Sequence, residues 1–389
     1  MSKYLNIISF NIPFPASYGG VIDVFFKLKA LHESGVKIIL HTFEYGRAHT
    51  EELNKYCEEV HYYQRKTGLK SQLSGLPYIV NSRKNKELVV NLLKNDYPIL
   101  FEGIHTCYYL DYPELKNRLK LVRAHNIEHI YYKGLFHNIN VSCKNLHKNL
   151  YKKLYMFIES QRLKRFEKKL QCADYILPLS STESEYFRQK YGTEKIVLVP
   201  LFHQNEQLEI ESKCKPYALY HGDLSTPENI RTALFLIEKI VGKDEHIPWI
   251  IAGMNPDKSI YRAAEKYKNL EIKANLSDPE MKKLINEAAV NILFTNQTSG
   301  VKLKLINSLY QGHYCLVNEK MLNGSGLGDL CVIVSEEPEK ILERIKEYLP
   351  KDFPESEIEK RKQILGELYD NQTNAEKIIE LIFGTAISS

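Results

Sequence analysis

Short apolar runs alternate with longer amphipathic stretches along most of this chain. The segment 21–31 is of the amphipathic type, with apolar side chains at 21, 24, 25, 28 and 31, a spacing that predicts a helix. Regular alternation of strands and helices is typical of a parallel sheet covered by helices. In the first half, the runs that predict strands are 4–10, 36–43, 59–63, 98–102, 119–124, 174–179 and 195–200.

The alternation stops at 202–216, a polar segment that ends in Pro216, and then starts again. This segment has no apolar periodicity, so we predict a linker between two domains. Beyond it the strand-like runs are 217–223, 248–254, 270–276, 290–296, 313–319 and 330–336, and 337–383 reads as consecutive helices. We therefore predict an α/β fold of two doubly wound, Rossmann-like domains, over 1–203 and 212–365. Two such domains that face each other would form a cleft, with ligands bound beyond the carboxyl ends of the strands.

Composition suits this organisation. The length of 389 residues fits two domains of ordinary size, and 43% hydrophobic residues can fill two cores. The net charge of +5 is unevenly placed, because 144–169 carries nine lysines and arginines against Glu159 and Glu167. Two interpretations of this segment stay open: a solvated helix face over a core, or a basic helix in peripheral contact with an anionic membrane. We expect no nucleic acid partner, because the rest of the chain is slightly acidic and carries no recognised binding motif.

The cysteines and the apolar segments bear on location. Seven cysteines are an odd number with no C-x-x-C pair, which argues against a disulfide framework and against a zinc site. No apolar run approaches the roughly 18 residues that span a bilayer. Pro13 and Pro15 directly follow the first apolar run, which we interpret as a strand and not as a signal peptide. We expect a protein of the reducing cytoplasm.

The stretch 295–317, TNQTSGVKLKLINSLYQGHYCLV, predicts a strand end, a loop, a helix that begins near Val301, and another strand. Lys302 and Lys304 lie in the first turn of this helix, where the helix dipole disfavours cations. A bound diphosphate would remove the conflict, because the unpaired N–H groups of a helix start attract anions. Asn307 lies one turn further on, where its amide could bind a diol such as a ribose. The alternative is an exposed helix with scattered lysines.

The loop 14–20, FPASYGG, follows the first predicted strand and opens a helix. Gly19 and Gly20 would let a ligand approach the backbone closely. The loop does not have the G-x-G-x-x-G pattern of dinucleotide-binding domains, so nicotinamide chemistry loses support. The alternative is a plain strand-to-helix turn.

The loop 123–129, RAHNIEH, follows another predicted strand. His125 could donate to an oxygen or act as a base, and Arg123 could pair with a phosphate. His129 lies four residues on, but no third ligand has a sensible spacing, so we expect no metal. The alternative for His125 is a structural histidine.

The loop 220–229, YHGDLSTPEN, places Gly222 after a strand and Ser225 and Thr226 before Pro227. This is an N-cap arrangement, so the loop either caps a helix well or forms a second ligand-binding loop. The chain has no G-x-S-x-G motif and no lysine-containing phosphate-binding loop.

Taken in order, these motifs resemble those of the GT-B glycosyltransferases, particularly the family-4-like bacterial enzymes that build surface polysaccharides. The last piece resembles a donor-site signature of the form G-I-K-x-K-x-x-E-A-x-x-x-G, and the resemblance covers nearly the whole chain. The pieces that carry it are PASYGG (15–20), RAHNIEH (123–129), FEKKLQCADYILPLSSTESEYF (166–187), HGDLSTPENI (221–230) and SGVKLKLINSLYQG (299–312).

The resemblance implies a role for each motif. The second domain would hold a nucleoside-diphosphate sugar as the donor substrate, with no cofactor, and His125 would approach the transferred sugar from the first domain. A final helix, about 368–389, would cross back to the first domain. The implied donor-binding residues are Gly222, Asn275, Leu276, Ser299, Gly300, Val301, Lys302, Lys304 and Asn307, and the implied residues of the acceptor side are Ser17, Gly19, Gly20 and Arg123.

The chain departs from the family pattern in the donor helix. Many members carry two glutamates eight positions apart, and the aligned residues here are Ser299 and Asn307. Asn307 could still bond to a ribose diol, without the charge-assisted strength of a carboxylate, whereas Ser299 is too short to reach sugar hydroxyls. Weaker, altered or lost donor binding is therefore one expectation.

We predict a hexosyltransferase that moves a sugar from a nucleoside-diphosphate donor to a hydroxyl of a glycan or lipid-linked acceptor, as in polysaccharide biosynthesis. Metal independence and retention of the anomeric configuration are implied by the resemblance. Two alternatives stay open: a non-catalytic nucleotide-sugar-binding or partner protein of the same fold, and a nucleotide-sugar epimerase, which would need more carboxylates near the sugar.

Overall fold

The computed structural model describes residues 2–72, 74–138, 146–210, 213–297 and 300–384. The chain divides into two compact units. Unit 1 comprises 1–204 and 369–389, and unit 2 comprises 205–368. The division after Gln204 falls inside the polar segment 202–216, whose described residues, 202–210 and 213–214, form no helix or strand before β7 begins at Lys215.

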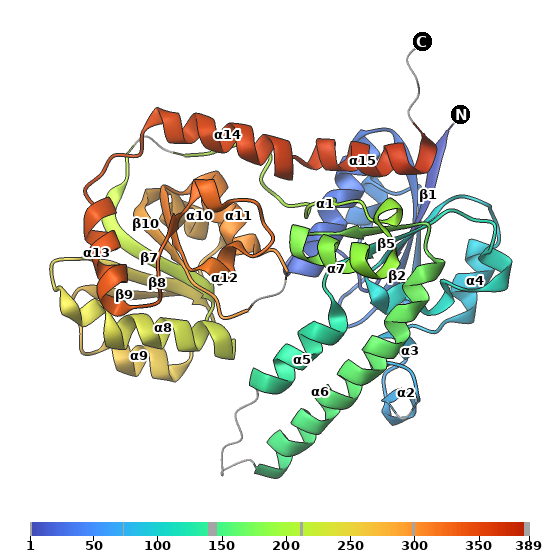
Figure 1. Ribbon diagram of the computed structural model, residues 1–389, viewed down its shortest axis with the longest axis horizontal. Coiled ribbons are helices and arrows are strands. Elements are labelled where there is room, and N and C mark those ends of the chain that lie inside the picture. Colours follow the sequence, from blue (N-terminus) through green and yellow to red (C-terminus); the bar gives the residue numbers. More distant parts are fainter. Residues whose placement is uncertain (1, 73, 139–145, 211–212, 298–299, 385–389) are drawn as a thin grey trace. The chain divides into compact units, whose positions relative to one another are not determined.

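Unit 1 is built on a six-stranded parallel sheet with the order β3-β2-β1-β4-β5-β6 (Figure 1). This is the order of a doubly wound sheet, in which the chain direction switches between β1 and β4. The strands are β1 (Lys3–Ser9), β2 (Val36–Glu44), β3 (Glu59–Gln64), β4 (Ile99–Glu102), β5 (Lys120–Ala124) and β6 (Tyr175–Pro178).

Helices cover both faces of this sheet. Successive side chains of a strand point to opposite faces, so Ile7 of β1 joins one apolar cluster and Ile8 joins the other. The helices of unit 1 are α1 (Gly19–Glu33), α2 (Leu69–Gln72), α3 (Tyr78–Asn81), α4 (Lys86–Leu92), α5 (Glu128–Asn138), α6 (Leu146–Phe166), α7 (Ser181–Tyr191) and α15 (Asn371–Phe383). Its 3-10 helices are Glu51–Lys55, Ile104–Tyr109, Pro113–Leu115, Glu167–Cys172 and Thr193–Lys195.

The last helix of the chain, α15, lies against α1 (Figure 1). Its Ala375 and Ile378 are fully buried in the same cluster as Val24 of α1. The Ser34 hydroxyl after α1 donates to Gln372 Oε1 of α15 at 2.8 Å. The expected return of the chain to the first domain is therefore found within unit 1.

Unit 2 repeats the doubly wound plan with a parallel sheet of order β12-β11-β10-β7-β8-β9. Here the chain direction switches between β7 and β10. Its strands are β7 (Lys215–Asp223), β8 (Trp249–Met254), β9 (Leu270–Ala274), β10 (Ala288–Leu293), β11 (Tyr314–Val317) and β12 (Val332–Ile333). Its helices are α8 (Pro227–Lys239), α9 (Lys258–Ala264), α10 (Asp278–Glu287), α11 (Leu303–Gln311), α12 (Glu319–Leu322), α13 (Pro338–Tyr348) and α14 (Glu355–Tyr369), with 3-10 helices at Val241–Lys243 and Gly328–Leu330.

The prediction of two doubly wound α/β domains is confirmed, and two details of it are wrong. Segment 195–200 is not a strand: only Ile196 forms a bridge, to Ile176 of β6. The backbone N–H groups of Val197 and Val199 still donate to β6 carbonyls, so the segment follows the sheet edge without completing a ladder. Helix α11 begins at Leu303, two residues later than expected, because Lys302 has an extended backbone and forms its N-cap.

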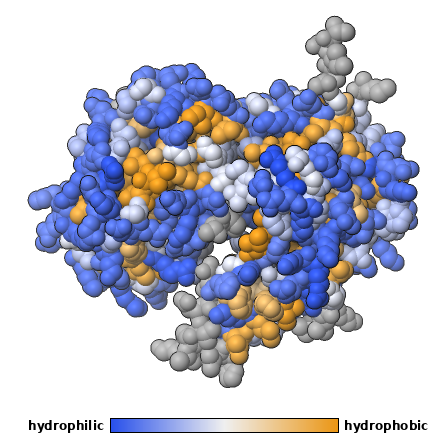
Figure 2. Space-filling view, in the orientation of Figure 1, coloured by the Kyte–Doolittle hydropathy of each residue, from blue (hydrophilic) through white to orange (hydrophobic). Residues whose placement is uncertain are grey.

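Outside the two cores, hydrophobic side chains gather on the surface over α5 and α6 (Figure 2). Within the described ranges, none of the helices combines the length and the apolar character that a membrane span requires.

Candidate active site

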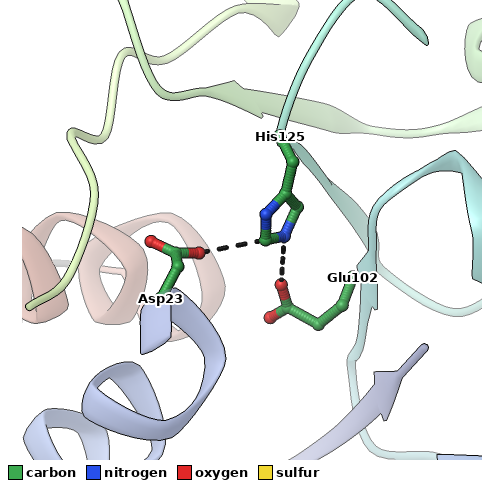
Figure 3. Close-up of side chains that lie close together, drawn as sticks. All are labelled: Asp23, Glu102 and His125. Atoms are coloured by element: carbon green, nitrogen blue, oxygen red, sulfur yellow. Dashed lines mark hydrogen bonds and ion pairs between the residues drawn. The ribbon is translucent and has the colours of Figure 1, made fainter. Parts of the chain in front are cut away.

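Three titratable side chains from separate elements meet at the carboxyl end of the unit 1 sheet (Figure 3). Asp23 belongs to α1, Glu102 ends β4, and His125 directly follows β5. The His125 Nε2 atom lies 3.0 Å from Glu102 Oε2 and 3.8 Å from Asp23 Oδ2. The cluster lies beside the switch between β1 and β4, where doubly wound sheets bind ligands.

Two cations neutralise the buried carboxylates of this cluster. Lys27 Nζ lies 3.0 Å from Asp23 Oδ2 and 2.8 Å from Glu102 Oε1. Arg123 donates to Asp23 through Nε at 3.0 Å and Nη2 at 2.7 Å. Burial alone would raise the two carboxyl pKa values, but the neighbouring cations hold the pKa of Asp23 and of Glu102 below the ordinary value. Both carboxylates are therefore charged at neutral pH.

His125 is oriented by this network. Its side chain is 9% exposed, and its ring packs edge-on against Phe10 with the centroids 5.5 Å apart. The ionised Glu102 can only accept hydrogen bonds, so we assign a proton to His125 Nε2. A carboxylate that fixes the tautomer of a histidine is a common arrangement in sites that use the ring as a base or acceptor.

A metal ion does not suit the same three side chains. Their ligand atoms lie within 4.8 Å of one another, which is close enough for one ion. The Lys27 ammonium, however, already bridges Asp23 and Glu102, and the Arg123 guanidinium holds Asp23. A divalent ion would meet two fixed positive charges there, and the carboxylates are already satisfied by ion pairs.

The interpretation of Arg123 as a phosphate-binding residue is wrong. Its side chain is fully buried and forms an ion pair with Asp23. Its remaining hydrogen bonds go to the carbonyl oxygens of Val199 and Pro200. The Phe202 backbone N–H also donates to Asp23, at 2.9 Å. Arg123 therefore links β5 to α1 and to the backbone at Val199 and Pro200, close to where the first segment of unit 1 ends.

Residues 14–18 of the predicted loop lead into α1, and Gly19 and Gly20 are the first two residues of that helix. Ser17 and Gly19 are exposed, and Ser17 Oγ accepts from the guanidinium of Arg47. Gly20 has a packing role, since a Cβ there would lie 2.8 Å from the ring of Phe10. The acceptor-side role of Ser17, Gly19 and Gly20 stays a prediction.

In unit 2, one carboxylate holds the loop that leads into α11. Glu228, in the first turn of α8, accepts at Oε1 from the backbone N–H groups of Asn296 at 2.9 Å and Gln297 at 3.2 Å. It also accepts from the hydroxyl of Thr295. The N-cap predicted for this helix is present, because the Thr226 side chain accepts from the Asn229 N–H and Pro227 is the first helical residue. Helix α8 is thus tied to the carboxyl end of β10.

The expected phosphate-binding residues lie at the start of α11, beyond the carboxyl end of β10. Gly300 has a positive φ of 70°, and Val301 connects it to the N-cap residue Lys302. The Lys302 ammonium donates to the carbonyl oxygen of Gly300. Ser299 lies outside the described residues.

Lys304 is directed into the unit. Its Nζ donates to the carbonyl oxygen of Phe294 at 2.9 Å and lies 5.4 Å from the ring centroid of Tyr220. Burial, with a smaller effect of Lys302, lowers the pKa of Lys304 to about 8, and Glu228 opposes the shift. A nearby anion would therefore change the charge of this side chain in the neutral to mildly alkaline range.

Asn307 is tied to the beginning of unit 2. Its Oδ1 accepts from Asn205 Nδ2 at 2.9 Å, and Asn205 Oδ1 accepts from Gln311 Nε2 at 2.7 Å. On the same helix, Ser308 Oγ lies 3.1 Å from His221 Nε2 of β7. Burial, assisted by Lys304, lowers the pKa of His221 to about 3, so this histidine is neutral.

The other expected donor-site residues, Gly222, Asn275 and Leu276, also lie at or just beyond the carboxyl ends of strands of this sheet. Gly222 lies near the end of β7 beside Gly253 of β8, and it is Gly253 that permits the close approach of the two strands, because a Cβ there would lie 1.8 Å from the Gly222 carbonyl oxygen. Asn275 follows β9 with a φ of 54° and accepts at Oδ1 from the backbone N–H of Asn255 at 2.7 Å. Leu276 packs on a small apolar cluster behind it. The structure places Asn275 and Leu276 at the edge strand β9, two strands away from Gly222.

Sequence reasoning missed Asp23, Lys27, Glu102 and Glu228. A signal existed for the first two, since they are opposite charges four positions apart in an apolar helical stripe. Glu102 ends a predicted strand, and ligands of parallel sheets bind beyond the strand ends. No local signal points to Glu228, because its partners lie 67 to 69 positions away.

No family model matches the chain. A relative from Klebsiella pneumoniae, described as an uncharacterized 44.6 kDa protein in cps region, is 27% identical over 338 residues, which cover 84% of this chain and 79% of the relative.

Solved structures match over almost the full length. A variant of TarM from S. aureus in complex with Fondaparinux, alpha-GlcNAc-glycerol and UDP has a TM-score of 0.65 at 11% identity, covering 98% of this chain and 100% of TarM. A glycosyltransferase from Rickettsia africae has a TM-score of 0.63 at 14% identity and covers 100% of both chains. HepE from Anabaena, in complex with UDP and glucose, has a TM-score of 0.62 at 10% identity, covering 98% and 99%.

These similarities define the class of fold. Two six-stranded parallel sheets in one chain, matched end to end by such structures, are the two-Rossmann-domain fold of the GT-B glycosyltransferases. The fold that the motifs implied is therefore confirmed.

Proposed function

We propose that this chain is a glycosyltransferase that moves a sugar from a nucleoside diphosphate to a hydroxyl of a glycan or lipid-linked acceptor. In the proposed reaction, the bond between the anomeric carbon and the diphosphate oxygen breaks, and a bond to the acceptor oxygen forms. The acceptor proton passes to the departing diphosphate. We propose retention of configuration, with the leaving phosphate assisting the incoming hydroxyl on the same face of the sugar.

The observation that carries this proposal is the full-length match of the fold to structures of two proteins in complex with UDP, one also with glucose and the other also with Fondaparinux and alpha-GlcNAc-glycerol. The match includes unit 2, in which the start of α11 and two lysines lie just beyond β10 and beside the switch point of the sheet. Ligands of doubly wound sheets bind at that position, and helix starts favour phosphate groups.

Unit 2 would bind the donor. The backbone N–H groups around Gly300 and Val301 and the ammonium of Lys302 would meet the diphosphate, with the charge of Lys304 beneath them. These groups stabilise the negative charge that develops on the leaving diphosphate, so the proposed reaction needs no metal ion. Asn307 would bond to the ribose, and the loop with Asn275 and Leu276 would flank the base.

His125 of unit 1 would contact the transferred sugar. Because Glu102 holds Nε2, the remaining ring nitrogen, Nδ1, would accept from a sugar or acceptor hydroxyl. Ser17, Gly19 and Gly20 would line the acceptor side. The Klebsiella relative in the cps region makes a surface polysaccharide precursor the acceptor class to test first. We propose a cytoplasmic location on the composition of the chain.

One observation favours a second candidate, a nucleotide-sugar-binding protein without turnover. Asn307 stands where many family members carry a glutamate, and its amide oxygen is engaged by Asn205. A ribose diol would have to compete with this hydrogen bond, which weakens donor binding relative to a charged carboxylate.

A turnover assay tests the proposal. The protein is incubated with UDP- and GDP-linked hexoses, with and without oligosaccharide or polyprenyl-linked acceptors, in the presence of EDTA. We expect release of nucleoside diphosphate, faster with an acceptor, and a product whose anomeric configuration matches the donor by NMR. Tight nucleotide binding without release would favour the binding protein, and conversion of the donor sugar without transfer would favour an epimerase.

A further inference from the structure

Helices α5 and α6 form a hairpin that extends from unit 1 (Figure 1). The two helices lie side by side along their length. The ring of Phe136 in α5 lies 5.9 Å from the ring of Phe157 in α6, and Lys153 Nζ lies 5.2 Å from the Phe136 centroid. At its base the hairpin is anchored by Glu159, which accepts from the Tyr78 N–H and pairs with Arg162. The hairpin is therefore joined to the rest of unit 1 by specific contacts.

Helix α6 carries apolar side chains on two opposite faces. One face includes Leu163 and Phe166 and is buried in unit 1. The other carries Leu150, Tyr151, Leu154, Phe157 and Ile158, which are between 38% and 66% exposed. Spacings of three, four, seven and eight positions put this second set on a single stripe, which we call the outer stripe.

The outer stripe is unusual for the surface of a single chain. Soluble proteins expose single apolar residues freely, but a contiguous apolar patch marks a site of interaction. Figure 2 shows the hydrophobic side chains gathered over this part of the molecule. All five residues of the stripe remain exposed, so none of them is buried by α5 or by another described element.

All exposed charge around the outer stripe is positive among the described side chains of 128–137 and 149–169. The three carboxylates in these ranges, Glu128, Glu159 and Glu167, are buried. The exposed basic side chains of the hairpin are Lys133, Lys152, Lys164, Arg165 and Lys168, and the last three continue the face of the stripe on α6, seven to eleven positions beyond Phe157 or Ile158. The surface therefore combines an apolar stripe with uncompensated cations.

We infer that the α5–α6 hairpin is a docking surface for an anionic lipid bilayer. The outer stripe would enter the boundary between head groups and acyl chains, and the long lysine side chains would reach the lipid phosphates. A nucleic acid would use the cations but not the apolar stripe. A second copy of the chain would set two basic surfaces against each other in a two-fold contact, which charge repulsion opposes.

Vesicle binding by the full chain tests this inference directly. The protein is mixed with vesicles of one part phosphatidylglycerol to three parts phosphatidylcholine, or with phosphatidylcholine alone, and the bound fraction is measured by flotation. We expect binding to the anionic vesicles, at least about tenfold weaker binding to the neutral ones, and a loss of binding as salt rises.

Two double variants separate the apolar and the charged contributions. Leu150→Glu with Leu154→Glu should reduce anionic-vesicle binding at least about tenfold, because each places a carboxylate in the stripe. Val90→Glu with Leu93→Glu is the matched control, since these residues of α4 and its C-cap are 61% and 47% exposed in the same unit. Lys164→Gln with Lys168→Gln, at two exposed lysines on the face of the stripe, should also weaken binding about tenfold. Lys86→Gln with Lys116→Gln removes the same charge elsewhere on unit 1 and should not.

Several results would overturn the inference: no binding to anionic vesicles, equal binding to neutral ones, or equal losses in the hairpin and control variants. A stable dimer in light scattering that the Leu150 and Leu154 changes dissolve would assign the stripe to a second copy instead. Thermal unfolding of each variant verifies that it is folded. The assay needs no donor and no turnover, so its outcome is independent of the proposed glycosyl transfer.

Discussion

His125 is positioned by Glu102, and ion pairs with Lys27 in turn position Glu102 and the neighbouring Asp23. Glu102 is fully buried, and Lys27 lies within ion-pair distance of both Glu102 and Asp23. Removing one member of such a network leaves an uncompensated buried charge, which is strongly destabilising. Removing the imidazole leaves the carboxylate–lysine pairs intact, so His125 can be tested without dismantling the cluster.

His125→Ala should lower turnover by about a hundredfold and leave the dissociation constant for nucleoside diphosphate within about twofold, because a sugar contact is lost and the nucleotide site is not. Turnover and titration of the purified variant check this, with His49→Ala, an exposed histidine of the same unit, as the control.

Equal losses of turnover and nucleotide affinity would make His125 a structural residue. Glu102→Gln provides a further check on orientation. It keeps the shape but removes the charge that holds the Nε2 proton, so turnover should fall while the dissociation constant for nucleoside diphosphate stays within about twofold.

Lys304 predicts a pH dependence of donor binding. Its pKa is lowered to about 8, chiefly by burial, and a bound diphosphate would favour the ammonium form. Binding should therefore take up a proton near pH 8, and affinity should fall as pH rises through and above about 8 while staying flat below it. Titration calorimetry in two buffers of different ionisation heat measures the uptake, and Lys304→Gln should abolish it. Buffer-independent heats near pH 8 would place the diphosphate away from Lys304.

At the level of single residues, the sequence located positions but not partners. His125 is indicated because it follows a predicted strand, and Lys302 because it lies at the start of a predicted helix, where a cation is otherwise unfavourable. The role of Arg123 was misread, since its partner Asp23 is 100 positions earlier and the strand order that joins them is not written locally. The order of the strands in the sheet decides which distant residues form ion pairs. A single sequence predicts the class of fold but not this order.

Helix α11 is fixed at its far end by an arginine from α14. Arg361 is almost fully buried, and its guanidinium donates to the carbonyl oxygens of Leu309, Gly312 and His313. Positive charge at the carbonyl end of a helix also suits the helix dipole. This contact positions the helix whose opposite end carries Lys302 and Lys304.

Arg361→Met should therefore destabilise unit 2 by about 2–4 kcal/mol, because buried carbonyl groups lose their donors. The chain has one tryptophan, Trp249 of β8, so its fluorescence during urea unfolding reports on unit 2. Arg344→Met, at an exposed ion pair of the same unit, should change stability by less than about 0.5 kcal/mol. Equal midpoints for the two variants would mean that Arg361 does not hold α11.

Elements were predicted well in existence and less well at their ends. Buried strands are continuous apolar runs, which is why β1, β5 and β8 were located within a few residues. The run 195–200 has the same composition but makes only scattered hydrogen bonds to β6. A hydrophobic run predicts that a segment is buried. Whether it pairs as a strand depends on the adjacent strand in the sheet, which the sequence alone does not identify.

At the scale of the whole molecule, unit 1 is made from both ends of the chain. Ile378 of α15 is fully buried in the cluster that contains Leu5 and Val24. Asn371 exchanges hydrogen bonds with His203 at 3.1 and 2.8 Å. The polar segment 202–216 predicts the boundary between the two domains. The return of the last helix to unit 1 was implied only by the resemblance, because the helical pattern of 371–383 does not indicate which surface the helix packs against.

Ile378→Ala should reduce the stability of unit 1 by about 2–4 kcal/mol, through lost burial and the cavity left behind. Hydrogen exchange in α1 and β1 should rise, while the Trp249 transition of unit 2 should stay in place. Glu376→Ala, on the exposed side of the same helix, is the control. Unchanged exchange in α1 would contradict the contribution of α15 to that core.

The central claim is that the start of α11 holds the diphosphate of a nucleotide-sugar, and calorimetric titration of UDP and GDP into the parent protein and Lys302→Ala tests it most directly. We predict saturable binding to the parent and a dissociation constant at least tenfold higher for Lys302→Ala, about 1.4 kcal/mol or more. Lys283→Ala, at an exposed lysine of unit 2, should bind like the parent. A dissociation constant that Lys302→Ala leaves unchanged would contradict the account.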